Sequence, residues 1–424
     1  MNFNDTEELL KKYSINAITP GLERIKILLE SLGEPQNNFD AFHIVGTNGK
    51  GSTGAYLNAI FYNSGYKTGF YSSPHLENPA ERLLINNKFL SADDWYKFIK
   101  ISCEKIKSGF EPSYFELLTA AAFLLARENN IKIGIIEAGL GGRLDATNLL
   151  KNTVCSVIAN ISIDHTEYLG DTLEKIAGEK FAVVKNNIPA CFSGYDESLK
   201  DLFKKYCAEA GAIPFIVSEQ TKLENIKFYK TGCEFDFYAP QLELKNVKIN
   251  LPGKFQVKNA ALALSAVACT QNKFNLKPEN ILIGMQKATW PGRFEIIKHD
   301  PEIILDGGHN YDGVKNLVES VKYLYPDKKI CVIYTAMRDK DYKGCLNLLN
   351  ELNPDFYFTT VPDMKRCLKP EELLNAAQSL NINSERVKTF DDPINAINEA
   401  AKSHKIILIC GSLYLIGFVR PHLI

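Results

Sequence analysis

The sequence predicts an α/β protein with an N-terminal, mostly parallel sheet of the P-loop type covered by helices on both faces, plus a smaller C-terminal α/β domain of the Rossmann-like type. Three observations predict it: two series of short apolar strand candidates alternating with helical patterns, a glycine-rich turn directly after the first strand, and 424 residues of which 45% are hydrophobic. Such alternation is typical of βαβ units, whose strands run parallel under covering helices. A chain of this length can form two or three domains with ordinary cores.

The first series of strand candidates ends before residue 195. Its members are Phe42–Val45, Thr68–Tyr71, Ile133–Glu137, Val154–Ala159 and Ile188–Phe192. Ligand sites in such sheets belong at the carboxyl ends of the strands.

Alternating hydrophobic residues between 221 and 251 then predict antiparallel strands, which we expect as an elaboration at the sheet edge. The second series follows the turn at 290–293 and comprises Ile303–Leu305, Lys329–Tyr334, Phe356–Thr359 and Ile406–Cys410. We therefore expect two domains, residues 1–295 and 296–424.

Composition argues against several classes of protein. With 49 basic and 50 acidic side chains the formal net charge is −1, so no overall field attracts nucleic acid or an acidic membrane surface. No apolar run approaches the roughly 20 residues that a membrane-spanning helix needs, and Met1–Lys12 lacks the apolar core of a signal peptide. The ten cysteines are scattered without metal-ligand spacing, as expected of small buried hydrophobes in a reducing compartment. We expect a cytoplasmic protein.

The glycine-rich turn reads G-T-N-G-K-G-S at 46–52, and a helical pattern begins at about Thr53. Glycines allow successive backbone N–H groups to face one anion, the following helix adds positive partial charge, and Lys50 supplies an ammonium group. The spacing departs from the common G-x-x-x-x-G-K-[ST] form, because Ile44 stands at the first glycine position and Gly51 separates Lys50 from Ser52. The turn predicts a nucleotide site; a purely structural glycine turn is the alternative.

Glu137 closes an apolar strand at the end where ligand sites lie, and the glycines that follow leave room for a ligand to approach the backbone. Magnesium takes few protein oxygens, so Glu137 with a hydroxyl such as that of Ser73 is a plausible ligand set. Judged from the residues alone, His165 is as well explained by a hydrogen-bonded core histidine, and Lys180 by a solvated helix charge.

Several runs, taken in order, resemble one family. They are G-T-N-G-K-G-S at 46–52, S-S-P-H-L at 72–76, E-A-G-L-G-G-R-L-D-A-T-N at 137–148 and D-H-T at 164–166, with P-G-R at 291–293 and D-G-G-H-N at 306–310 further on. Together they resemble the folylpolyglutamate synthases and dihydrofolate synthases, the folate branch of the Mur ligase superfamily. The resemblance implies ATP-dependent, magnesium-requiring ligation of L-glutamate to a folate through an acyl phosphate. It also implies that residues 1–295 form an ATP-binding domain with a folate-binding N-terminal segment, and that residues 296–424 form the C-terminal ligase domain.

The resemblance assigns roles to individual residues. Catalytic roles fall to Lys50, Lys180, His165 and Arg293. Contacts with ATP fall to Thr47, Asn48, Gly49, Lys50, Gly51, Ser52, Asn259, Arg293, Asp306 and His309. Two magnesium ions would be held by Ser52, Ser73, Glu137, His165 and Lys180, the last as an N6-carboxylated (carbamylated) lysine. Contacts with folate or dihydropteroate fall to Ala17, Ile18, Thr19, Ser113, Tyr114, Phe115, Glu116, Leu144, Asp145 and Ala146.

Within the family the alternatives are polyglutamylation of tetrahydrofolates, ligation of glutamate to dihydropteroate, or both. Thr19 stands where some bifunctional relatives carry an acidic residue, which argues against dihydropteroate. A nucleotide-binding regulatory protein without catalysis is the alternative from another class. The runs S-P-H-L at 73–76 and G-L-G-G-R-L-D-A-T-N at 139–148 argue against a peptidoglycan ligase. Since relatives mostly act alone, we expect a monomer whose partners are ATP, L-glutamate and a folate or dihydropteroate.

Overall fold

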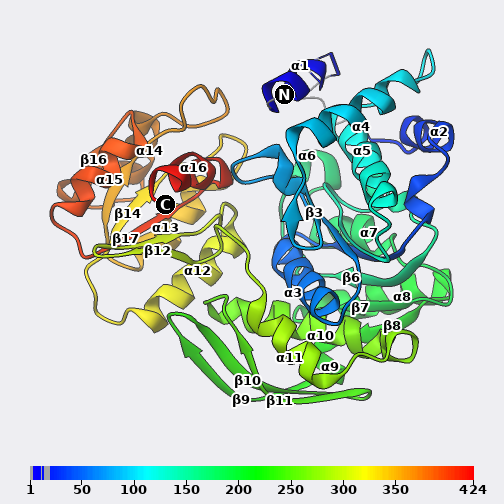
Figure 1. The fold of residues 1–424 in the computed structure, drawn as a ribbon. Helices are drawn as coiled ribbons and strands as arrows, with labels where there is room; N and C mark the ends of the chain where they lie inside the picture. The colour runs from blue at the N-terminus through cyan, green and yellow to red at the C-terminus, as the bar shows by residue number, and fades with distance from the viewer. Residues whose placement is uncertain (1–2, 11, 14–19) are drawn as a thin grey trace. The chain divides into compact units, whose positions relative to one another are not determined.

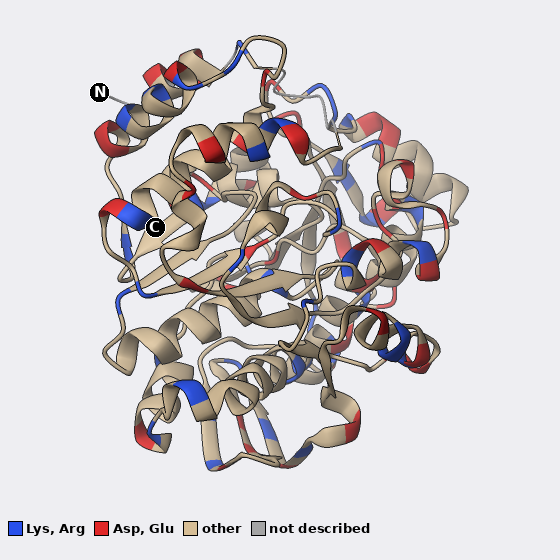
Figure 2. Ribbon diagram, turned by 90° about the vertical axis from the view of Figure 1, so that its right-hand side faces the viewer, with Lys and Arg blue, Asp and Glu red and all other residues tan. Residues whose placement is uncertain are grey.

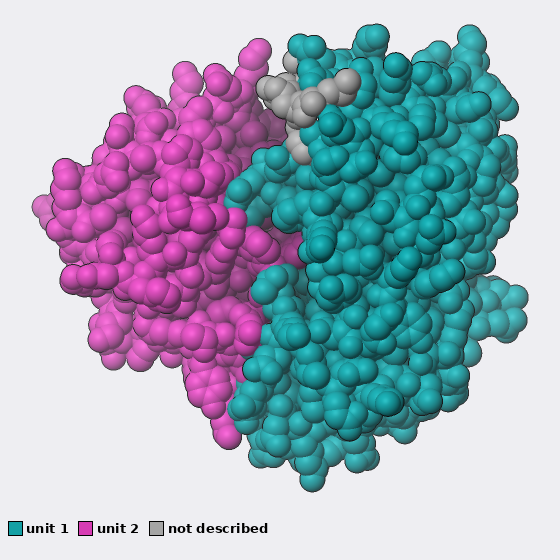
Figure 3. Space-filling model, in the orientation of Figure 1, with its two compact units in different colours: residues 1–226, 234–249, 258–289 teal, residues 227–233, 250–257, 290–424 magenta. Residues whose placement is uncertain are grey.

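The computed structural model of the chain describes residues 3–10, 12–13 and 20–424 (Figure 1). It divides into two compact units, which are coloured separately in Figure 3. Unit 1 comprises residues 1–226, 234–249 and 258–289, and unit 2 comprises residues 227–233, 250–257 and 290–424. Among the described residues, no helix combines the length and apolar character needed to cross a membrane. Basic and acidic residues are interspersed along the helices in Figure 2, in keeping with the net charge of −1.

In the part of the chain that the structure describes, unit 1 contains an eight-stranded sheet of order β4-β3-β2-β5-β1-β6-β7-β8. Its strands are β1 (Asp40–Val45), β2 (Thr68–Tyr71), β3 (Leu83–Ile85), β4 (Lys88–Phe89), β5 (Ile133–Glu137), β6 (Thr153–Ile158), β7 (Pro189–Phe192) and β8 (Ile213–Ile216). Strands β2, β5, β1, β6, β7 and β8 pair in parallel, while β3 and β4 extend the edge as an antiparallel hairpin. The predicted mostly parallel sheet is confirmed.

Helices cover both faces of this sheet. Neighbouring residues of one strand point to opposite faces, so a single strand contacts helices on both sides. The hydroxyl of Tyr71 hydrogen-bonds to Thr119 of α5 (3.0 Å), whereas the ring of Phe70 lies against Gly54 of α3 on the other face. The helices that lie wholly in unit 1 are α1 (Phe3–Leu10), α2 (Glu23–Ser31), α3 (Lys50–Asn63), α4 (Ala92–Glu104), α5 (Tyr114–Glu128), α6 (Thr166–Leu169), α7 (Leu173–Phe181), α8 (Lys200–Ala210), α9 (Val217–Gln220) and α11 (Pro278–Lys287). Its 3-10 turns are η1 (Pro35–Asn37), η2 (Pro79–Arg82), η3 (Ala146–Leu149) and η4 (Glu197–Leu199).

Three further strands form a separate small sheet of order β11-β10-β9 within the described chain. They are β9 (Lys222–Tyr229), β10 (Gly232–Ala239) and β11 (Leu242–Ile249), joined by two-residue connections that only antiparallel neighbours allow. The antiparallel strands are confirmed, but the expectation that they extend the large sheet is wrong. The chain then continues into the long helix α10 (Lys254–Phe274).

Unit 2 contains a six-stranded sheet, counted over the described residues, of order β12-β13-β17-β14-β15-β16. Its strands are β12 (Glu295–His299), β13 (Glu302–Leu305), β14 (Cys331–Tyr334), β15 (Asp355–Phe358), β16 (Val387–Thr389) and β17 (Ile406–Cys410). Only the β12–β13 pair is antiparallel among these pairings. The helical elements of unit 2 are α12 (Tyr311–Leu324), α13 (Tyr342–Asn350), α14 (Pro370–Ser379), α15 (Pro393–Ala401) and α16 (Leu413–Val419), with 3-10 turns η5 (Ser384–Arg386) and η6 (Arg420–His422). The prediction of a second α/β unit, in which strands alternate with helices after residue 293, is confirmed.

Candidate active site

The glycine-rich turn connects β1 to α3, and α3 begins at Lys50, three residues before the predicted start. Gly46 and Gly49 have φ angles of 148° and 90°. A Cβ added at Gly46 would lie 2.8 Å from the Cβ of Ala159, and one added at Gly49 would lie 2.4 Å from Oδ1 of Asn259. The turn is therefore packed between the end of β6 and helix α10, and the predicted nucleotide residue Asn259 lies directly beside it.

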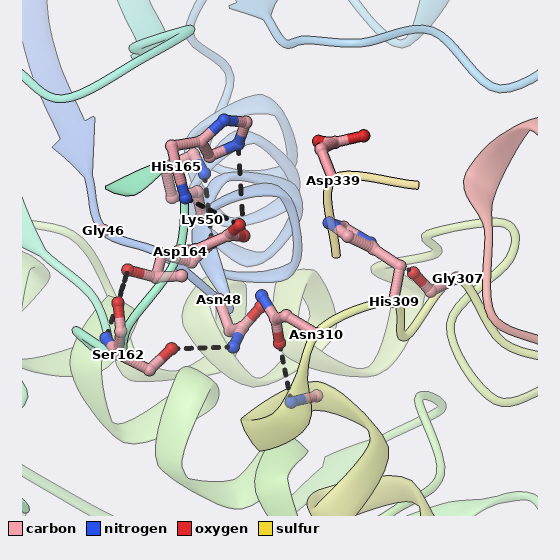
Figure 4. Close-up of polar contacts among 12 residues, drawn as sticks. Gly46, Asn48, Lys50, Ser162, Asp164, His165, Gly307, His309, Asn310 and Asp339 are labelled. Atoms are coloured by element: carbon pink, nitrogen blue, oxygen red, sulfur yellow. Dashed lines mark hydrogen bonds and ion pairs between the residues drawn. The ribbon is translucent and has the colours of Figure 1, made fainter. Parts of the chain in front are cut away.

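The side chains of Thr47 and Asn48 hold the turn against the loop that follows β6, and Figure 4 shows Asn48 beside Ser162 of that loop. Thr47 Oγ1 donates to the Ser162 carbonyl oxygen (3.0 Å) and accepts from the Ser162 amide (3.1 Å). Asn48 Nδ2 donates to Ser162 Oγ (3.3 Å). These contacts place the loop that carries Asp164 and His165 next to the glycine-rich turn at 46–52 (the phosphate turn).

Lys50 and Glu137 converge, as the sequence predicted. Lys50 begins α3, just after the turn that follows β1, and Glu137 ends β5; β1 and β5 pair in parallel, with Ile44 opposite Glu137. The Lys50 Nζ lies 3.7 Å from Glu137 Oε1 and donates to the Thr47 carbonyl oxygen at 3.3 Å. The ammonium group of Lys50 and the buried carboxylate of Glu137 therefore lie together at the carboxyl ends of the central strands β1 and β5.

Lys180 lies beneath the phosphate turn rather than in solvent. It is 3% exposed, and its Nζ donates to the Gly46 carbonyl oxygen at 3.0 Å. Burial, followed by the nearby Lys50 ammonium, lowers the pKa of Lys180 to about 7. The reading of Lys180 as a solvated helix charge is wrong, and the position beside the phosphate turn agrees with the family-based expectation.

His165 and Asp164 lie on the loop after β6 that contacts the glycine-rich turn. The side chain of His165 is 39% exposed and its Nε2 lies 4.0 Å from Asp164 Oδ2, so the alternative of a core histidine is wrong. Asp164 is nearly buried, and its negative charge also acts on Lys180. The sequence analysis gave Asp164 no role, although an acidic residue adjoining the candidate histidine was a usable signal.

The hydroxyls of Ser52 and Ser73 stand in different surroundings. Ser52 is buried in the first turn of α3. Ser73 Oγ is buried and has no hydrogen-bond partner among the described residues. A buried polar oxygen without a partner is costly, so this atom suits a ligand-binding role. No group of three or more His, Cys, Asp or Glu side chains forms a metal site within the described ranges. The available donors, Glu137 with serine hydroxyls, nevertheless fit magnesium, which keeps phosphates and waters as its other ligands.

The glycines after Glu137 leave less room for a ligand than expected. A Cβ at Gly139 would lie 2.5 Å from the Phe115 ring, and one at Gly142 would lie 2.8 Å from the Glu179 carbonyl oxygen. Protein atoms rather than open space meet this turn, so the expectation that these glycines admit a ligand is wrong at Gly139 and Gly142. The same packing brings the proposed folate residue Phe115 to the turn.

The remaining folate candidates are held by local hydrogen bonds. Ser113 and Glu116 cap α5, with Ser113 Oγ accepting from the Glu116 amide (3.3 Å) and Glu116 Oε2 from the Ser113 amide (2.6 Å). Glu116 also pairs with Arg24 (3.1 Å), and the Tyr114 ring lies 6.0 Å from the Arg82 guanidinium. Leu144, Asp145 and Ala146 lie on the turn after β5 that leads into η3. Ala17, Ile18 and Thr19 lie outside the described residues.

In unit 2, Arg293, Asp306 and His309 gather at the carboxyl end of β13. Asp306 Oδ2 accepts from the Phe294 amide (2.9 Å) and Oδ1 from the Gly308 amide (2.7 Å). Burial raises the pKa of Asp306, while Arg293 nearby acts in the opposite direction. His309 Nδ1 lies 2.9 Å from the Gly307 carbonyl oxygen (Figure 4). The carboxylate thus fixes the turn that carries Arg293.

Comparisons with known proteins extend over the whole chain. Residues 44–267 match the Mur ligase middle domain, and residues 292–413 match the glutamate ligase domain of Mur ligases. The chain is 33% identical to the dihydrofolate synthase/folylpolyglutamate synthase of Bacillus subtilis (strain 168), over 96% of this chain and 95% of the relative. It is 28% identical to the folylpolyglutamate synthase of Lacticaseibacillus casei, over 100% and 99%.

Solved structures agree in fold. The Mycobacterium tuberculosis folylpolyglutamate synthase complexed with ADP superposes with a TM-score of 0.91 at 27% identity, over 99% of this chain and 98% of that chain. The E. coli FolC in complex with DHPP and ADP superposes with a TM-score of 0.90 at 27% identity, over 100% and 97%. The structure brings Lys50, Lys180 and Glu137 together at the phosphate turn, as the motifs predict. The similarity extends over nearly the whole chain, and the chain belongs to the folylpolyglutamate synthase/dihydrofolate synthase family of the Mur ligase superfamily.

Proposed function

We propose that this protein joins L-glutamate to folates at the expense of ATP, acting on tetrahydrofolates and also on dihydropteroate. The observation that carries the proposal is the convergence of Lys50, Glu137 and Lys180 at the phosphate turn, in a chain that resembles the family over nearly all of its residues. The relative from Bacillus subtilis is named for both activities, which supports the dual substrate range. We further propose that it acts as a cytoplasmic monomer with no nucleic-acid or membrane partner, in line with its net charge of −1.

The first chemical step is activation of a carboxylate. The turn at 46–49 and the N-terminus of α3 present backbone N–H groups to the phosphates of ATP, while Asn259 lies beside the turn for a contact with the base. A carboxylate oxygen of the folate attacks the γ-phosphorus, the bond to ADP breaks, and an acyl phosphate forms. Lys50 lies where its ammonium group can spread the developing negative charge. We assign Arg293, Asp306 and His309 of unit 2 to ATP as well.

The second step is amide formation. The amine of L-glutamate attacks the acyl carbon, phosphate leaves, and the nitrogen loses a proton. The exposed ring of His165, beside Asp164, is our candidate for a group that holds or moves protons near the phosphates. Folate would be bound by the segment 17–19, by the N-terminus of α5 and by the turn at 144–146.

Glu137, Ser73, Ser52 and His165 would hold two magnesium ions. The buried, unpaired hydroxyl oxygen of Ser73 and the carboxylate of Glu137 support this assignment. When bound, magnesium neutralises phosphate oxygens and orients them for in-line transfer. We propose that Lys180 is carbamylated: its neutral amine attacks carbon dioxide, forming a carbamate and releasing one proton. A buried amine with a pKa of about 7 is half neutral near that pH, as the reaction requires.

The test is ADP and phosphate release by the purified chain with L-glutamate, and with dihydropteroate and a tetrahydrofolate in parallel. Lys50→Ala is expected to abolish ADP formation with either folate. Lys175→Ala, which removes an exposed lysine of α7 that pairs with Asp171, is the matched control and is expected to keep full activity. Glutamate-dependent turnover in Lys50→Ala would contradict the scheme, and nucleotide binding without turnover by the wild type would favour a regulatory protein.

A further inference from the structure

A buried histidine in β1 stands outside the chemistry described above. His43 is 0% exposed, and its Nε2 lies 2.8 Å from Oγ1 of Thr147, which is 104 residues further along the chain. A hydrogen bond across this separation joins the strand that leads into the phosphate turn to η3, which follows the glycine turn after Glu137.

The direction of this contact follows from its neighbour. Thr147 Oγ1 donates its single proton to Asp145 Oδ1 at 2.6 Å, so it can only accept from His43. The ring must then carry its proton on Nε2. The His43 Nδ1 is buried without a hydrogen-bond partner among the described residues, which suits a bare nitrogen better than an N–H group. Burial and the nearby Lys185 lower the pKa of His43 to about 3, and the ring is therefore neutral.

The chain of hydrogen bonds ends on a carboxylate that shapes the turn after β5. Asp145 is 5% exposed. Its Oδ2 accepts from the Leu140 amide (2.8 Å) and its Oδ1 from the Thr147 amide (3.0 Å) as well as from the Thr147 hydroxyl. One carboxylate thus ties the start of the turn, beside Glu137, to its end at η3.

We propose that His43 and Thr147 are positioning residues for the folate substrate: they fix the Asp145 carboxylate and, through it, the turn from Glu137 to Ala146. The inference rests on the proposed function, because it takes Leu144–Ala146 as part of the folate site. Thr47 and Asn48 of the glycine-rich turn are anchored on Ser162 rather than on these hydrogen bonds, so we expect ADP binding to depend on them much less than folate binding does.

The experiment compares Thr147→Val, which keeps the volume but loses the hydroxyl, with Thr147→Ser, which keeps the hydroxyl. Thr147→Val is expected to raise the KM for the folate or lower kcat by about tenfold or more, as for other groups that orient a binding residue. The dissociation constant for ADP is expected to stay within about twofold of the wild type, and Thr147→Ser to recover most of the activity. Because Thr147 is the link, His43→Leu combined with Thr147→Val is expected to be no worse than Thr147→Val alone.

A second readout does not depend on activity. The 15N spectrum of the His43 ring is expected to show the neutral tautomer with its proton on Nε2, and a charged ring or a proton on Nδ1 would overturn the assigned direction. An active wild type with an unaltered Thr147→Val overturns this inference alone. Equal losses in both Thr147 variants that follow their melting temperatures would also overturn it, since they indicate stability only. A wild type without turnover on either folate overturns the proposed function and this inference together.

Discussion

Lys180 differs most from what its neighbours in the sequence indicate. It lies in the last turn of an amphipathic helix, where a lysine is usually solvated, yet it is 3% exposed and hydrogen-bonded to the Gly46 carbonyl oxygen. Its surroundings come from the phosphate turn, 134 residues away, which lies over the last turn of α7. The unusual chemistry of this side chain is therefore a product of tertiary packing.

The carbamylation proposed for Lys180 would make activity depend on carbon dioxide. The neutral fraction of the amine rises as pH rises through the folded pKa of about 7, so the modification is favoured above that pH. Ligase activity is expected to fall in buffers depleted of carbon dioxide and to return on adding bicarbonate. Lys180→Arg, which stays charged, is expected to be inactive in both buffers. Full activity of Lys180→Arg would contradict the modification.

Two histidines of unit 1, the buried His43 and the half-buried His75, predict a loss of stability in acid. Burial lowers the pKa of both His43 and His75 to about 3 in the folded chain, from 6.5 in model compounds. The unfolded chain therefore binds more protons between these values, and stability that is complete above pH 6.5 is lost as pH falls toward 3. Each histidine contributes a slope of up to about 1.4 kcal/mol per pH unit. Urea unfolding across this range is expected to show the slope, and His43→Gln to reduce it. An unchanged slope in His43→Gln would exclude His43 as a source.

At the level of elements, helix α3 begins earlier than its residues predict. Gly51 and Ser52 are poor helix formers, so the pattern places the start at about Thr53, whereas the helix begins at Lys50. Gly49 supplies the left-handed residue before it, with φ of 90°. The turn packs against Ala159 and Asn259, and this tertiary packing overrides the low helix propensity of Gly51 and Ser52.

Gly49 is expected to tolerate no side chain. In Gly49→Ala the new Cβ would meet Asn259 at 2.4 Å, displacing the turn, and ADP affinity is expected to fall by about 100-fold because small displacements of a binding group are costly. Gly65→Ala is the matched control: Gly65 has φ of 88° but open space around its Cα, so only backbone strain of about 1–2 kcal/mol is added. Calorimetry of ADP binding tests both. Equal ADP affinities for the two variants would show that the contact with Asn259 is unimportant.

On the scale of the whole molecule, the chain passes between the units more than once. Residues 227–233 and 250–257 belong to unit 2 although unit 1 surrounds them in the sequence. Within unit 2, Phe228 contacts Tyr323 with ring centroids 5.4 Å apart, and the Lys254 ammonium lies 4.6 Å from the same ring. Cutting the chain near residue 290 would therefore separate residues 227–233 and 250–257 from the rest of unit 2.

A fragment of residues 290–424 is accordingly expected to be less stable than unit 2 in the full chain. The lost aromatic and cation–π contacts amount to roughly 1–3 kcal/mol. Hydrogen exchange of the β14 and β17 amides, compared between fragment and full chain, measures the difference. Tyr323→Ala in the full chain is expected to reproduce part of it, and identical protection in all three proteins would contradict the expectation.

The sequence by itself determined the two mostly parallel sheets and the family. Strands β2, β5 and β17 have the predicted bounds, because buried parallel strands are continuous apolar runs with polar or glycine residues at their ends. The phosphate turn and the E-A-G-L-G-G-R-L-D-A-T-N run carried the nucleotide and folate assignments. Both signals are local in the chain.

Only the tertiary structure decided which polar groups are buried and what they contact. The inward position of Lys180, the bond of His43 to Thr147 and the turn folded around Asp145 each depend on partners supplied by other elements or by the path of the backbone. The separate small sheet was missed for the same reason, since alternation defines strands but not their neighbours. Burial and hydrogen bonding between distant residues are properties of the folded chain, and no short window of sequence contains them.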